Sequence, residues 1–243
     1  MKNQYFGDIN DYKKYSLIRY LSGNGKLRTL ICWMLTEDDK GSDGSRISYL
    51  QDSKTWRRYD PLIYDGIRQH LINEGKRNVN CLTKMSILPS SEFYMEPLKD
   101  DIEKRKRYFD ILFSKHEEMD LFFFDPDNGI EIKSIRKGKK NSSKYLYWDE
   151  VGTAFELSSA VMIYQHFPRV DRNRFIQTMT ETGRKMIPQA DIFTYATSHV
   201  LFLLFTHREN RKFILNSNKK ISSAWKGVVR INGNYFSKDE KSK

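Results

Sequence analysis

The chain has 243 residues, and its 42 Lys and Arg against 31 Asp and Glu give a formal net charge of +11, which favours a polyanionic partner such as nucleic acid over plain solubility. Two cysteines in apolar runs, Cys32 and Cys81, exclude a disulfide framework or a zinc cluster and are expected in the core. No apolar run approaches the ~20 residues of a membrane span and the first residues lack the apolar stretch of a signal peptide, so we expect a soluble, cytoplasmic protein with no membrane partner.

Helix and strand patterns alternate along the chain. In the first half they predict a helix from Asp8 or Asp11 to Gly23, a strand at 27–35, a polar loop at 36–46, a helix from Asp60 to Gly75, a strand at 78–85 and an amphipathic helix at 98–118. In the second half they predict a strand at 121–124, a basic run at 133–144, a helix at about 148–155, a strand at 158–165, a helix at about 171–185, and a strand pair or one bent strand at 191–205.

This alternation predicts a Rossmann-like, doubly wound α/β fold with a mainly parallel sheet. No repeat or linker divides the chain, so we expect one domain over 1–243, with a polar tail from about 235. The stretch 86–97 fits neither pattern.

The segment DLFFFDPDNGIEI, residues 120–132, concentrates polar side chains at the end of an apolar strand. A carboxylate that directly follows four apolar residues is costly unless it has a partner or a task. Similar polar groups follow the neighbouring strand candidates: Glu37, Asp38 and Asp39 after one, and Gln165, His166 and Arg169 after another. Because ligands bind beyond the carboxyl ends of parallel strands, we expect one cleft to receive all three groups. Solvated acidic turns and a structural histidine are the simpler alternatives.

Two stretches resemble known enzymes. The apolar strand ending in Asp125 and Pro126 resembles the catalytic Asp-Pro-Pro-Tyr region of class I S-adenosylmethionine-dependent amino-methyltransferases. The opening FGDINDYKKYSLIRYL is similar to the Gly-Asn-x-Ala-Asp-x-x-Lys-His start of bacterial 23S rRNA adenine-N6 methyltransferases, with matches at Gly7, Asp11 and Lys14. The three-Cys-motif partner proteins of bacterial defence neighbourhoods are a looser resemblance.

The resemblance implies the methyltransferase type of the fold and an enzyme that modifies an exocyclic base amine, with Asp125 accepting hydrogen bonds from that amine. It implies two groups of site residues: a catalytic group of Asp125, Asp127, Asn128 and His166, and an S-adenosylmethionine-binding group of Asp11, Lys14, Asp38 and Asp39. The chain departs from the pattern in two places. Asp127 and Asn128 replace the second proline and the stacking aromatic residue, and the loop TEDDKGSDG lacks a tight glycine turn directly after the strand.

Two other functions suit the same residues. Asp125, Asp127, Asn128 and Glu131, completed by Asp8, Asp11 or Asp38, offer the oxygen ligands that Mg²⁺ or Mn²⁺ prefers. With His166 and Lys14 acting on a phosphate, they predict a metal-dependent nuclease or phosphoesterase. The third possibility is an inactive nucleic-acid-binding subunit of a larger, defence-type complex.

Each of these functions suits the basic run at 133–144. We expect Lys137, Lys139 and Lys140, together with Arg169, to contact nucleic-acid phosphates. A solvated loop with no ligand is the alternative for this run.

Overall fold

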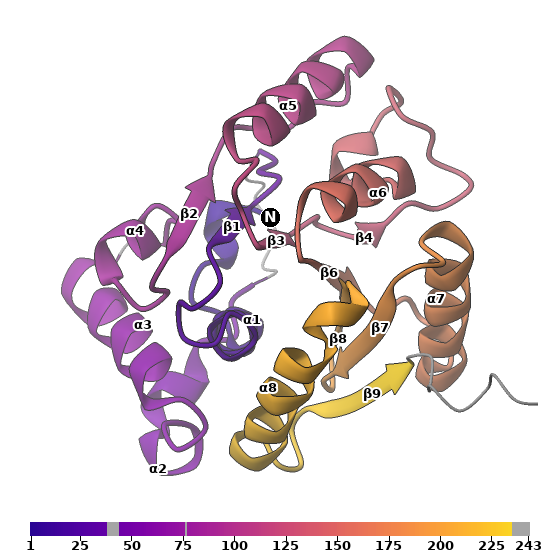
Figure 1. The fold of residues 1–243 in the computed structure, drawn as a ribbon. Helices are drawn as coiled ribbons and strands as arrows, with labels where there is room; N and C mark the ends of the chain where they lie inside the picture. The colour runs from indigo at the N-terminus through magenta and orange to yellow at the C-terminus, as the bar shows by residue number, and fades with distance from the viewer. Residues whose placement is uncertain (38–43, 76, 235–243) are drawn as a thin grey trace, which may run out of the picture.

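The fold is built on a seven-stranded sheet with the strand order β2-β1-β3-β6-β8-β7-β9 (Figure 1). A computed structural model of the protein describes residues 1–37, 44–75 and 77–234. Its strands are β1 Thr29–Cys32, β2 Ser91–Tyr94, β3 Leu121–Phe124, β6 Ala160–His166, β7 Asp191–Ala196, β8 Val200–Thr206 and β9 Arg230–Asn234; β4 Gly129–Ile130 and β5 Tyr145–Leu146 form a separate parallel pair.

Five strands of the sheet run in one direction, and β8 and β9 run against them. The central strand β3 pairs in parallel register with β1 on one side and β6 on the other. The mainly parallel α/β architecture expected from the alternating patterns is therefore confirmed. It places the carboxyl ends of β1, β3 and β6 side by side.

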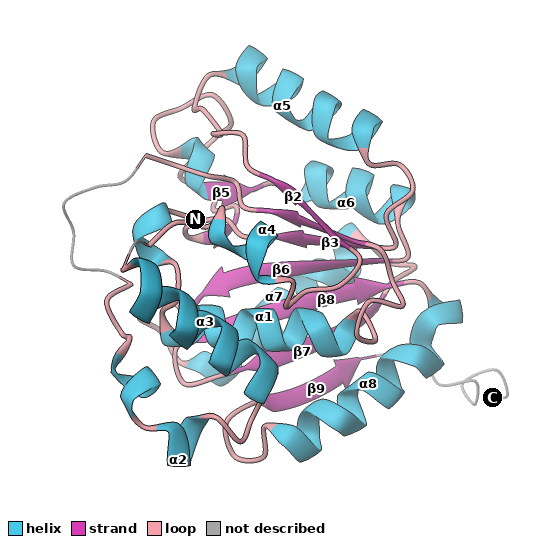
Figure 2. Ribbon diagram, turned by 90° about the vertical axis from the view of Figure 1, so that its left-hand side faces the viewer, coloured by secondary structure: helices cyan, strands magenta, loops and turns pink. Residues whose placement is uncertain are grey.

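Helices cover both faces of the sheet (Figures 1 and 2). They are α1 Ile9–Leu21, α2 Ser53–Trp56, α3 Pro61–Glu74, α4 Cys81–Met85, α5 Ile102–Lys115, α6 Trp148–Leu157, α7 Arg172–Met186 and α8 Arg211–Ala224, with short 3-10 turns η1 Asn3–Tyr5, η2 Ser48–Gln51, η3 Ser142–Lys144 and η4 Arg208–Asn210. Alternate residues of β3 point to opposite faces. Leu121 and Phe123 join the core under α1, α3 and α8, whereas Phe122 and Phe124 join the core under α5, α6 and α7. No helix in the described ranges is long and apolar enough to cross a membrane.

Local chemistry sets the ends of the best-predicted helices. Asp60 caps α3 by accepting a hydrogen bond from the Ile63 amide, Pro61 occupies the first turn, and Gly75 ends the helix at a φ of 62°. Asp8 caps α1 by accepting from the Asn10 amide. Helices α5, α6 and α7 and the strand pair β7 and β8 also lie where the patterns predict them.

Other predictions of secondary structure were wrong. Residues 78–85 were expected to form a strand but contain α4, and the strand that pairs with β1 is β2, inside the stretch that fitted neither pattern. The first strand covers 29–32 and not 27–35. Both β2 and α4 are only four or five residues long, too short for periodicity to separate helix from strand.

Candidate active site

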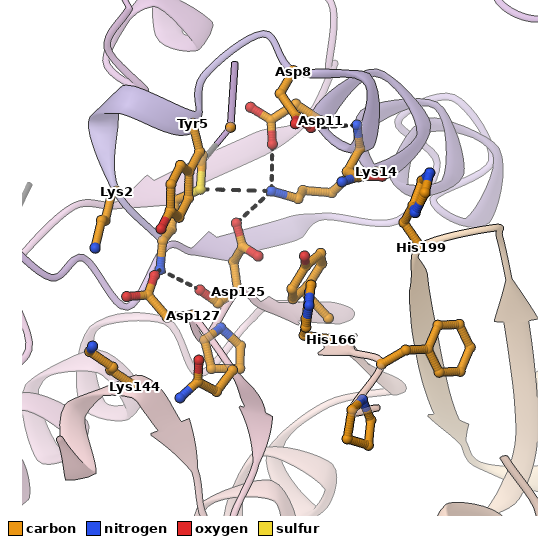
Figure 3. A pocket seen from close by; sticks show the side chains of 18 of the residues that line it. Lys2, Tyr5, Asp8, Asp11, Lys14, Asp125, Asp127, Lys144, His166 and His199 are labelled. Carbon is orange, nitrogen blue, oxygen red and sulfur yellow. Dashed lines mark hydrogen bonds and ion pairs between the residues drawn. The ribbon is translucent and has the colours of Figure 1, made fainter. Parts of the chain in front are cut away.

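A cleft of about 920 Å³ opens beyond the carboxyl ends of β3, β6 and β7 (Figure 3). Three parts of the chain line it: the N-terminal segment with α1, the loop that follows β3, and the loop between β6 and α7. His199, from the turn between β7 and β8, closes a further side. The topology therefore gathers polar side chains that lie more than a hundred positions apart in the sequence.

Lys14 stands at the bottom of this cleft between two carboxylates. Its Nζ lies 2.7 Å from Oδ1 of Asp11 and 2.6 Å from Oδ2 of Asp125. The side chains of Lys14 and Asp125 are only 2% and 3% exposed. The rings of Trp33 and Tyr164 each have their centre 5.5 Å from the same Nζ. One buried cation thus joins the two stretches that carry the resemblance.

The three matched positions of the opening stretch form one hydrogen-bonded unit. The Gly7 amide donates to Oδ2 of Asp11 at 3.0 Å, and the Tyr15 hydroxyl donates to the same oxygen at 2.9 Å. Lys14 donates to the other oxygen of Asp11. Gly7 has a φ of +80°, and a Cβ there would lie 2.8 Å from the Leu71 side chain, so the turn requires glycine. Asp11 therefore positions Lys14, which in turn holds Asp125.

Burial dominates the electrostatics of this triad. Burial raises the pKa of Asp125 above its usual value, although the Lys14 ammonium opposes that rise. Burial by itself would lower the pKa of Lys14, but the adjacent Asp11 and Asp125 raise it above its ordinary value. Lys14 is therefore a fixed cation at neutral pH. Lys14 binds Oδ2 of Asp125, and the Asp125 carboxylate lines the cleft.

Asp8 is a second acid of the cleft with perturbed chemistry. Burial, and then repulsion by Asp11, raise the pKa of Asp8 from its usual 3.8 to about 6. A carboxylate that ionises near neutral pH inside a cleft is a typical feature of functional sites.

The loop after β3 is held by Gln165. Its Oε1 accepts from the Ile130 amide at 2.8 Å, and its Nε2 donates to the Asn128 carbonyl at 3.1 Å. Gly129, at a φ of +114°, passes so close that a Cβ would lie 2.3 Å from this amide. Asp127 accepts from the Thr36 hydroxyl at 2.7 Å and pairs with the Met1 amine at 2.6 Å. Although burial raises the pKa of Asp127, that amine and Thr36 bring it below its usual value.

Several residues predicted for the site line the same cleft. These are Asp125, Asp127, Asn128, His166, Asp11, Lys14 and Arg169. Of the three groups expected to share one cleft, those after β3 and β6 contribute to it, whereas Glu37 of the group after β1 does not line it. Asp38 and Asp39 lie outside the described residues. Glu37 is exposed and pairs with Lys99 at 2.9 Å, and Glu131 accepts a hydrogen bond from the Trp148 amide at the start of α6.

The basic run lies apart from the cleft, except for Lys144. Lys137 pairs with Asp149 at 2.5 Å and with Glu150 at 3.2 Å, so its charge is already balanced. Lys139 and Lys140 are exposed and do not line the cleft. The buried guanidinium of Arg105 donates to the carbonyls of Ser142 and Tyr145 and so fixes the end of this run. Lys137 and Arg105 thus fix parts of the run, while Lys139 and Lys140 stay exposed, as the solvated-loop alternative expects.

The residues of the cleft that sequence reasoning missed include Arg46, Tyr164, Arg172 and His199. Tyr164 carries a signal, because it alternates with Met162 and His166 on one face of β6. Burial and the nearby Asp125 raise the pKa of Tyr164 well above its usual value. Arg46, Arg172 and His199 follow no motif, and only the fold brings them to one wall.

Within the described ranges, one group of three metal-ligating side chains has its ligand atoms within 4.8 Å of one another, namely His70, Glu74 and Cys81. None of the three lines the cleft. Among the described residues, the carboxylates expected as ligands for Mg²⁺ or Mn²⁺ do not form such a group, and Asp38 lies outside that part of the chain.

Comparisons with known proteins add little. No family model and no curated protein matches the chain. It is similar to a solved structure, protein LPL1258 from Legionella pneumophila str. Philadelphia 1, of the family model DUF519. The two share 10% sequence identity with a TM-score of 0.45, over 96% of this chain and 98% of that one.

Proposed function

We propose that the protein is a nucleic-acid-directed methyltransferase of the Rossmann-like methyltransferase type, acting on an exocyclic base amine. The observation that carries the proposal is the contact between Lys14 and Asp125, which joins the two stretches of resemblance at the bottom of one cleft. The order of the strands is consistent with it, since β1, β3 and β6 are neighbours and the stretch with Asp125 follows the central one.

The residues of the cleft fit S-adenosylmethionine in size and charge. Burial and the neighbouring Asp11 raise the pKa of Asp8, so its charged form is unfavourable. S-adenosylmethionine carries a net positive charge, and its binding would stabilise that charged form. Asp8 would hold its ammonium group, and Lys144 would hold its carboxylate. When bound, the group supplies a methyl on a sulfonium.

Asp125 positions the amine that is to be modified. Lys14 holds Oδ2, which orients the carboxylate and keeps its negative charge beside a buried cation. Oδ1 then accepts a hydrogen bond from the amine and favours the positive charge that develops on its nitrogen. The ring of Tyr164, beside Lys14 in the cleft, offers a stacking surface that Asn128 cannot provide.

We do not propose the metal-dependent nuclease. The ammonium of Lys14 lies between Asp11 and Asp125, where a divalent cation would need both carboxylates. Glu131 and Asp127 are engaged in hydrogen bonds with Trp148 and Thr36.

The test combines calorimetry with methyl transfer. Purified protein is titrated with S-adenosylmethionine and, separately, with Mn²⁺, and is then supplied with methyl-labelled S-adenosylmethionine and single-stranded DNA or RNA. We expect S-adenosylmethionine to bind and label to reach the nucleic acid, and Asp125→Asn to abolish the transfer. Asp149→Asn, which removes an exposed carboxylate outside the cleft, serves as the matched control. Binding of Mn²⁺ without binding of S-adenosylmethionine refutes the proposal.

A further inference from the structure

One wall of the cleft collects positive charge from three separate segments. Arg46 comes from the loop before η2, His166 and Arg172 from the end of β6 and the start of α7, and His199 from the turn between β7 and β8. We call these four residues the basic wall. Figure 3 shows His166 and His199 on the same side of the cleft, opposite Lys2 and Lys144.

The arginines of this wall differ from three other arginines of the fold. Arg19, Arg105 and Arg211 pair with Asp60, Glu150 and Asp191 at 2.8, 2.7 and 2.5 Å. Among the residues that the structure describes, no carboxylate lies within 4.0 Å of the guanidinium of Arg46 or Arg172. Arg172 instead lies 5.5 Å from the centre of the Phe167 ring.

The charges of the wall are close enough to repel one another. Burial lowers the pKa of His199, and Arg46, Lys13, Arg172 and His166 lower it further. Lys13, only 3% exposed on α1, behaves similarly: burial lowers its pKa to about 8, with Arg46 adding to the effect and Asp8 opposing it. The acidic Asp171 also lines the cleft. Its carboxylate accepts a hydrogen bond from the Arg174 amide and so caps α7. Arg46 and Arg172 thus bring positive charge to this wall, and an anion bound there would relieve the repulsion that lowers the pKa of His199.

We infer that the basic wall binds the phosphate adjacent to the target base, so that the substrate is a nucleotide unit of a single strand and not a free base or nucleoside. This inference rests on the proposed function, which assigns the base to Asp125. The cleft then binds the two parts of a nucleotide with groups of opposite charge. The Asp125 carboxylate at the bottom accepts a hydrogen bond from the base amine, and the basic wall donates hydrogen bonds to the phosphate. Guanidinium groups match phosphate oxygens in a planar, two-point geometry that lysine lacks. A single strand leaves the base free to enter the cleft.

The test measures binding of a fluorescein-labelled oligodeoxyadenylate of about 12 nucleotides, a typical length for a single-strand site, by anisotropy at several salt concentrations. We expect the double variant Arg46→Ala, Arg172→Ala to lose at least about tenfold in affinity, because two charged hydrogen-bond donors are removed. The slope of log K against log salt should flatten by about 0.7 for each phosphate that the protein no longer neutralises.

The matched control is Lys104→Ala, Lys106→Ala, which removes the same charge from exposed positions of α5 outside the cleft. It should keep the wild-type affinity and slope. Equal losses in both double variants, or none in either, overturn the inference. Thermal unfolding checks that both variants fold. We expect that they do, because the replaced side chains are exposed and form no ion pair among the described residues.

The two proposals fail separately. If the wild type transfers no methyl group but the basic-wall variant still loses affinity and slope relative to the control, the phosphate subsite stands and the methyltransferase does not. If methyl transfer occurs and the basic-wall variant keeps the wild-type KM for the oligonucleotide, the subsite is refuted and the methyltransferase stands.

Discussion

Replacing Asp8 by asparagine should stabilise the protein at neutral pH. The amide keeps an oxygen that can accept the capping hydrogen bond from the Asn10 amide, which lies 2.6 Å from the Asp8 carboxylate. What it removes is a charge that burial and Asp11 make unfavourable.

The magnitude follows from the pKa of Asp8. A carboxyl group of pKa 3.8 in the unfolded chain and about 6 in the fold binds its proton more tightly when folded, which corresponds to about 3 kcal/mol. The wild type therefore loses this stability as the pH rises from about 4 to about 6, and stays destabilised above it. The Asp8→Asn variant does not lose stability with rising pH through this position, because asparagine does not ionise.

Urea unfolding at pH 7.5 and at pH 4 measures the difference. We expect Asp8→Asn to raise the free energy of unfolding by about 2 to 3 kcal/mol at pH 7.5, and by much less at pH 4. Asp110→Asn, at an exposed position of α5, should change neither value appreciably. An Asp8→Asn variant that is no more stable than the wild type at pH 7.5 refutes the reasoning, because it means that neighbouring cations balance the buried charge.

Three other substitutions test the triad and the loop. Lys14→Met should lower the free energy of unfolding by about 3 to 5 kcal/mol at neutral pH, because it leaves two buried carboxylates unpaired. Chemical unfolding measures this loss, and a loss below about 1 kcal/mol contradicts the buried pairing. Gly129→Ala should displace Gln165 and strain the backbone, so we expect a lower melting temperature and weaker S-adenosylmethionine binding, whereas Gly152→Ala, in open space on α6, should lower neither. Asp125→Asn should keep the fold while methyl transfer is lost, and circular dichroism with a transfer assay separates the two; a variant that fails to fold shows that the carboxylate acts mainly as the partner of Lys14.

The sequence by itself predicts the elements whose ends are set by neighbouring residues. The Asp60 cap, Pro61 and Gly75 act within a few positions of one another, and α3 lies where they predict it. The apolar run at 191–205 is too long for one strand, and it forms the pair β7 and β8. Short elements such as α4 and β2 have too few residues to show a helix or strand period. Their structure depends on tertiary contacts, such as the pairing of β2 with β1.

The tertiary structure determined which side chains of the site contact one another. Asp125 and Lys14 were both candidates from the sequence, but they lie 111 positions apart, and nothing local predicts that one holds the other. Within the basic run, the fold pairs Lys137 with Asp149 and Glu150 and leaves Lys139 and Lys140 exposed, a difference that the sequence does not predict. Meanwhile Arg46 and His199, unremarkable in sequence, meet at the wall of the cleft. A side chain's type is written in the sequence, but its charge balance depends on burial and on which distant groups contact it, and those are set only when the chain packs.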